Sequence, residues 1–179
     1  MLQELITEIK ARNAKTKAWV AEDPGNRWAG LYPEDAAHWL ERGITSLADL
    51  ERDELITYIY DEHKTAFGTK GRHYDFDSMS LEELRIEADY ISAAAKEQME
   101  LEAAQEARAL EAFKALVQET IRNGAGNEET ALRWLTEEET FYHGQCVESW
   151  VWDQGILFTD YGRELVKKLM TIVEFKEVA

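Results

Sequence analysis

Apolar residues recur at helical spacing over most of the chain, and the longest such stretch runs from Ser80 to Arg122. Its apolar positions, from Leu84 to Ile121, keep a mean spacing close to the 3.6-residue repeat of one helix face. No glycine or proline interrupts the stretch. At about 1.5 Å per residue, a helix of this length would extend on the order of 60 Å. The pattern therefore predicts one long helix that serves as a spine or an arm.

Both ends of this stretch carry residues typical of helix termini. Ser80 and Glu83 have the spacing of a capping box, in which each side chain bonds to the backbone amide of the other residue. Asn123 and Gly124 follow the last apolar position, and both residue types tolerate the left-handed conformation that ends helices. The centre, residues 93–109, is rich in alanine. It can admit another helix closely, or it can stay bare as a connector.

Shorter helical patterns flank the long stretch on both sides. Before it we expect helices over residues 2–14, 34–42, opened by Pro33, and 46–64; after it we expect helices over 127–139, 145–154 and, capped by Asp160, 161–175. The sequence therefore predicts an all-α fold with helical modules at both ends of one long central helix. Its expected parts are an acidic N-terminal module (residues 1–79), the connecting helix (80–123) and a C-terminal module (124–179).

The charge balance narrows the class of partner. The chain has 36 acidic and 20 basic residues, for a formal net charge of -16. Nucleic acids and anionic membranes attract surfaces rich in Lys and Arg, so we expect no direct contact with either. A protein with a basic surface is the expected partner. One cysteine, no apolar run of membrane-spanning length and no signal peptide lead us to expect a cytoplasmic protein.

Two groups of residues are candidate chemical sites. His73, Asp75 and Asp77 alternate along a loop and could meet at a divalent cation, but aspartates are also ordinary loop residues before a helix. His143 and Cys146 are three residues apart, although zinc requires four ligands and the cysteine lies in an apolar stretch. We favour the structural interpretation in both cases, and expect no enzyme activity, no metal and no cofactor.

The acidic surface is the feature of the sequence that indicates a function most clearly. Residues 31–62 hold nine acidic and two basic side chains. Carboxylates presented in place of phosphates can compete with DNA for a basic groove, although duplex DNA carries one charge per about 1.7 Å and is far denser than this chain. The leading candidate partner-binding residues are eight of the nine acidic side chains of this section: Glu34, Asp35, Asp49, Glu51, Asp53, Glu54, Asp61 and Glu62. Three consecutive glutamates of the C-terminal module come second: Glu137, Glu138 and Glu139.

Several short segments, spread over most of the chain, carry a resemblance to a known group of proteins. They are residues 17–19 (KAW), 28–30 (WAG), 60–64 (YDEHK), 71–73 (GRH), 79–84 (MSLEEL), 124–127 (GAGN) and 131–135 (ALRWL). Together they resemble a group of small acidic accessory proteins of tailed bacteriophages, of the anti-restriction or anti-defence type. The resemblance transfers no catalytic residue. It implies an accessory protein that acts in the cytoplasm of a host cell.

We therefore expect a phage-type anti-defence inhibitor. It would bind a host defence or nucleic-acid-processing protein through its acidic surfaces, acting as a DNA mimic. The alternative is a non-enzymatic structural or assembly protein that self-associates through the long helix, as a homodimer.

Overall fold

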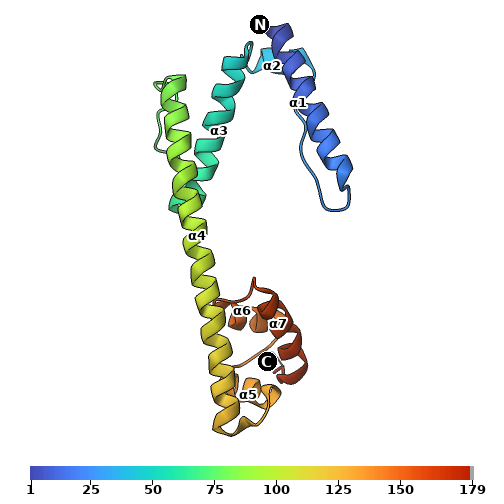
Figure 1. Cartoon of the computed structure of the whole chain (residues 1–179), viewed down its shortest axis with the longest axis vertical. Helices are drawn as coiled ribbons and strands as arrows, with labels where there is room; N and C mark the ends of the chain where they lie inside the picture. The colour runs from blue at the N-terminus through green and yellow to red at the C-terminus, as the bar shows by residue number, and fades with distance from the viewer. Residues whose placement is uncertain (178–179) are drawn as a thin grey trace. The chain divides into compact units, whose positions relative to one another are not determined.

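The computed structural model describes residues 1–177, which fold into seven α-helices (Figure 1). In chain order they are α1 (Leu2–Glu22), α2 (Ala36–Glu41), α3 (Leu47–Phe67), α4 (Leu81–Thr120), α5 (Glu128–Leu135), α6 (Gly144–Asp153) and α7 (Asp160–Ile172). Within the described residues, the β-structure is limited to an isolated bridge between Phe141 and Phe175. The all-α prediction, with helices at both ends of one long central helix, is confirmed. None of the described helices is long and apolar enough to span a membrane.

The central helix α4 begins as its sequence predicts. The Glu83 amide donates to Ser80 Oγ at 3.2 Å, and the Ser80 amide donates to Glu83 Oε2 at 2.7 Å, which is the capping box. At its other end α4 passes into a π-helical turn, η1 (Ile121–Ala125). Gly124 and Gly126 have φ angles of 128° and 75° there, in the region that glycine adopts most easily. The predicted end of the helix falls inside this turn.

The chain divides into two compact units, each with its own hydrophobic core. The first unit, Met1–Gln98, has one apolar cluster among α1, α2 and the start of α3, and another between the end of α3 and the first part of α4. The second unit begins at Met99, and its cluster joins the last part of α4 to α5, α6 and α7. The division thus falls inside α4, because each half of that helix contributes side chains to a core, whereas the sequence suggests boundaries at 79/80 and 123/124.

Two helices near the N-terminus differ from the predicted ranges. α1 continues to Glu22 and stops only where the turn at Asp23 begins. α2 starts at Ala36, because the Asp35 side chain caps it, so Pro33 precedes the helix rather than opening it. The sequence predicts the start of this helix at Glu34, two residues before its first residue, Ala36.

Two helices of the second unit are also shorter than predicted. α5 ends at Leu135, so Glu137 and the two glutamates after it follow the helix instead of forming its last turn. α7 is capped by Thr159, whose hydroxyl accepts from the Gly162 amide, and Asp160 is its first residue. A threonine side chain at this position satisfies an amide that the helix itself cannot.

Candidate functional site

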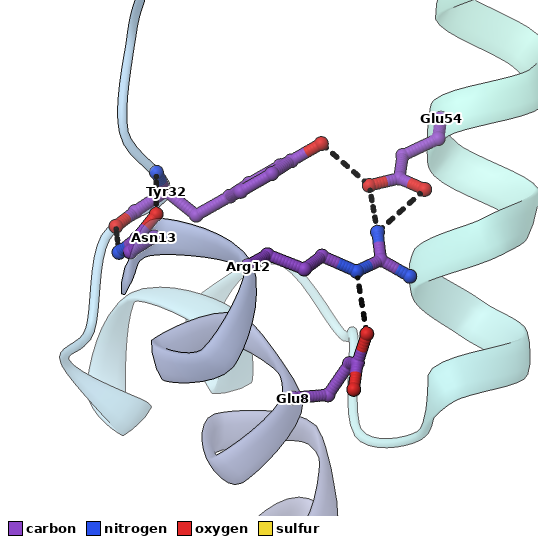
Figure 2. Close-up of polar contacts among 5 residues, drawn as sticks. All are labelled: Glu8, Arg12, Asn13, Tyr32 and Glu54. Atoms are coloured by element: carbon purple, nitrogen blue, oxygen red, sulfur yellow. Dashed lines mark hydrogen bonds and ion pairs between the residues drawn. The ribbon is translucent and has the colours of Figure 1, made fainter. Parts of the chain in front are cut away.

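Arg12 lies at the centre of a polar network that joins α1, the segment before α2, and α3 (Figure 2). Its Nε donates to Glu8 at 2.9 Å, and its Nη1 donates to the two Glu54 oxygens at 2.9 and 3.2 Å. The Tyr32 hydroxyl donates to the same Glu54 carboxylate at 2.6 Å. The hydrogen bond to Glu8 is the main cause that raises the pKa of Arg12, and the bond to Glu54 is the main cause that raises the pKa of Tyr32. Glu54 is therefore engaged by two donors and helps to hold the first unit together.

Asn13, the next residue along α1, fixes the segment before α2 through its side chain (Figure 2). It is buried, with 2 % of its surface exposed. Its Oδ1 accepts from the Tyr32 amide at 2.9 Å, and its Nδ2 donates to the Tyr32 carbonyl at 2.8 Å and to Glu34 at 3.1 Å. Sequence reasoning missed this role. The signal was present, because Asn13 continues the apolar row of Leu5 and Ile9 at helical spacing.

Two of the predicted binding residues serve as helix caps. Asp35 accepts from the Ala37 amide at 3.0 Å at the start of α2. Asp49 accepts from the amides of Thr45 and Ser46, both at 2.9 Å, in the capping box of α3. These bonds, led by the one from the Thr45 backbone, lower the pKa of Asp49. The Asp35 and Asp49 carboxylates bind backbone amides that the helix itself leaves without an acceptor. Less of each carboxylate is therefore open to a partner.

Two further predicted carboxylates on α3 form two-point ion pairs with arginine. Glu51 accepts from Arg85 of α4 at 2.7 and 2.8 Å, and Arg85 lowers the pKa of Glu51. Asp53 accepts from Arg42 at 2.8 and 2.9 Å. All four side chains are at least one-third exposed. Exposed ion pairs contribute about 0–1 kcal/mol, so a partner's cation can compete for these carboxylates at small cost.

The remaining predicted carboxylates of the first unit are held more loosely. Asp61 pairs with Lys70 at 2.7 Å, and its side chain is 59 % exposed. Glu34 lies 3.8 Å from Lys17, near the limit for an ion pair. Glu62 is half-buried. Asp61 is thus more open to a partner than the caps or Glu54, whereas Glu34 also accepts a hydrogen bond from the buried Asn13 side chain.

Glu137, Glu138 and Glu139 form a different kind of surface, in the second unit. All three are exposed in the connection between α5 and α6. Across residues 1–177, no Lys or Arg forms an ion pair with any of them. Arg133 and Lys176 line the same hollow as Glu137 and Glu139, but within the described residues neither forms an ion pair with them. These are the predicted residues that offer the most uncompensated negative charge.

The loop between α3 and α4 is packed on itself. The His73 ring lies 4.2 Å from the Tyr74 ring and 5.0 Å from the His63 ring, centroid to centroid. His63 is buried, and its Nδ1 lies 2.5 Å from the Thr69 carbonyl oxygen. Arg52 of α3 donates to the Met79 carbonyl at 2.6 Å. His63 is therefore a packed aromatic ring beside the loop, and the ring of the exposed His73 contacts it from the loop side.

The residues of the two candidate chemical sites are arranged as follows. Asp75 and Asp77 are exposed, and the described residues include no group of three His, Cys, Asp or Glu side chains placed to hold a metal ion. In the second unit, Cys146 Sγ lies 3.6 Å from His143 Nδ1, and the cysteine is half-buried against the core. Among the side chains at these positions, the carboxylates are the ones that can form ion pairs with a partner.

Comparisons with family models, curated proteins and solved structures find no match for this chain. The resemblance to bacteriophage accessory proteins therefore stays a prediction. The carboxylates of this chain differ chiefly in whether they have partners inside the molecule.

Proposed function

We propose that this chain is a non-enzymatic inhibitor of the anti-defence type, which binds a basic surface of a host nucleic-acid-targeting protein. The observation that carries the proposal is the exposed row of Glu137, Glu138 and Glu139, which has no ion pair within the described residues. A partner's Lys or Arg can bind this row without displacing an internal cation. Each such bond is charge-assisted and gains from the like charge of its neighbours.

Exposed ion pairs of the first unit add a second set of carboxylates. Asp61, Glu51 and Asp53 can exchange their internal cation for one from the partner, because exposed pairs are worth about 0–1 kcal/mol. The net charge of -16 also attracts a basic partner over distances of about one Debye length, roughly 8 Å in physiological salt. We therefore expect the glutamate row to contribute most to binding of the partner, and the exchangeable ion pairs to contribute less.

The test is capture of bacterial proteins by the tagged full-length chain, with washes at low and high salt and a further wash with duplex DNA. We expect a DNA- or RNA-binding protein to be retained at low salt and released both by high salt and by the duplex. Release by salt follows from screening of exposed charges. Release by DNA follows if both ligands occupy one basic groove.

A matched pair of variants separates a specific surface from general acidity. The first variant carries Glu137→Gln, Glu138→Gln and Glu139→Gln. The second removes the same charge elsewhere in this unit through Glu119→Gln, Glu148→Gln and Asp153→Asn, all at exposed positions. We expect only the first to lose the captured protein. Equal losses in both variants, or capture that resists high salt, would contradict the proposal.

A further inference from the structure

The second unit contains an apolar groove of about 680 Å³ between α4 and the α6–α7 connection. Met99 and Ala103 form the α4 side, and Trp152, Leu157 and Phe158 form the other. Met99, Trp152 and Phe158 are 59 %, 57 % and 64 % exposed, so large apolar side chains line the groove without filling it. Apolar patches of this kind mark interaction sites more often than bare surface.

The conformation of Gly155 shapes the side of the groove that lies opposite α4. Gly155 ends α6 with a φ of 72°, a left-handed conformation that turns the chain toward Leu157. A Cβ on Gly155 would lie 3.2 Å from Ala109 Cβ, so the missing side chain lets the connection approach α4 closely. The Trp152 and Phe158 rings then meet edge to face at 5.4 Å. These contacts hold two large aromatic rings at the surface instead of in the core.

Ala103 is the small residue on the α4 side of the groove. The apolar row of α4 is covered at Phe113 and Val117, which belong to the core of the second unit. The same row is open at Met99 and Ala103, both exposed. Small residues allow another backbone to approach a helix closely. The row therefore presents a site where a further element can pack.

The charge around the groove selects one class of occupant. Glu102 and Glu106 lie on the same wall, four residues apart, beside the apolar row. From Met99 onward the chain has sixteen acidic and eight basic residues, a net of -8. Like charge opposes a second copy of this unit, and it also opposes an anionic membrane. A cationic segment complements Glu106 and the unit as a whole.

We propose that this groove binds an amphipathic helix of a partner protein, with bulky apolar side chains on one face and Lys or Arg beside them. Residues of α4 at the groove repeat every four positions, in Met99 and Ala103 and again in Glu102 and Glu106. A helix presents its own side chains at the same spacing, so its apolar row meets Met99 and Ala103 while a cation beside that row meets Glu106. This site uses other residues than the glutamate row, so either proposal can fail alone.

The probe is a labelled synthetic helix of leucine and lysine, with all leucines on one face, titrated with the full-length chain by fluorescence anisotropy. One control peptide has the same composition with leucines scattered around the helix, and another has glutamate in place of lysine. We expect saturable binding of the first peptide, and at least about tenfold weaker binding of both controls, because the site requires one apolar face and positive charge together.

Two pairs of variants locate the site. Ala103→Gln places a longer polar side chain in the groove and should weaken binding about tenfold, whereas Ala104→Gln, at the neighbouring exposed position outside the groove lining, should not. Glu106→Gln should weaken binding about two- to fivefold, and Glu119→Gln should leave it unchanged. Glutamine is a good helix former, so all four variants keep α4 intact, as circular dichroism will verify.

Several outcomes would overturn the proposal. These are equal binding of the scattered peptide, equal effects of Ala103→Gln and Ala104→Gln, or stronger binding of the glutamate peptide. A further one is a concentration-dependent dimer, seen by sedimentation, that Ala103→Gln abolishes while the leucine–lysine peptide fails to bind. That result would assign the groove to a second copy of the chain.

Discussion

Replacing Gly162 with alanine should destabilise the second unit, although alanine is the better helix former. Gly162 lies in the first turn of α7 and is buried. A Cβ at this position would lie 1.9 Å from the Ile156 carbonyl oxygen and 2.7 Å from its carbon. Ordinary contact begins at 3.4 Å, so the two backbone segments would have to separate by roughly 1.5 Å, more than a packed interior absorbs without loss.

The cost can be worked from the contacts around Ile156. Its carbonyl oxygen accepts from the Thr159 amide at 3.0 Å and from the Thr159 hydroxyl at 2.7 Å, while that hydroxyl caps Gly162. The Ile156 side chain is fully buried in the core. Overpacking costs about 1–3 kcal/mol and loss of the cap about 1 kcal/mol, against a helix-propensity gain of about 1 kcal/mol. We expect a net loss of about 1–3 kcal/mol.

Gly144→Ala is the matched control, because Gly144 also lies in a helix of the second unit. Its added Cβ would lie 2.4 Å from Met170 Cε, the free end of a flexible and partly exposed side chain. Met170 can rotate away, so this variant should stay within about 1 kcal/mol of wild type.

Thermal unfolding by circular dichroism measures the difference between these two variants. For a cooperative unit of this size, we expect Gly162→Ala to lower the Tm by roughly 5–20 °C. Hydrogen exchange read by mass spectrometry should show faster exchange in α6 and α7. A Gly162→Ala protein that melts at or above the wild-type temperature, or no lower than Gly144→Ala, would refute the reasoning.

Three smaller predictions concern the first unit. Asn13→Leu should cost about 1–3 kcal/mol in thermal unfolding, because it removes the buried amide that holds the Tyr32 backbone. Tyr32→Phe should cost about 0.5–1 kcal/mol, because it removes only the hydroxyl bond to Glu54. Asp49, whose pKa is lowered in the folded chain, stabilises α3 above its unfolded pKa near 3.8, and this contribution is lost as pH falls through the folded value. Asp49→Asn should therefore be less stable than wild type at neutral pH, and the gap should close in acid.

The long helix could be predicted because its determinants are local. The Ser80 and Glu83 side chains, an uninterrupted apolar row and the glycines at 124 and 126 all act within a few residues of the backbone they fix. Local residues do not determine which part of that row is covered by other helices. Phe113 is buried and Met99 is exposed only because α5, α6 and α7 fold back over one portion of α4. Periodicity alone contains no information on that choice.

The candidate site shows the same limit more sharply, because the value of an acidic side chain depends on distant residues. Glu54 meets Arg12 across 42 positions, and Glu51 meets Arg85 across 34. The charge count along the sequence even ranks these carboxylates of residues 31–62 ahead of Glu137.

The fold separates them, since Glu54 is held by an arginine and a tyrosine while Glu137 has no ion pair within the described residues. Charge density in a sequence therefore yields only a prediction of the class of partner. Only the internal pairing decides which carboxylates remain to bind it.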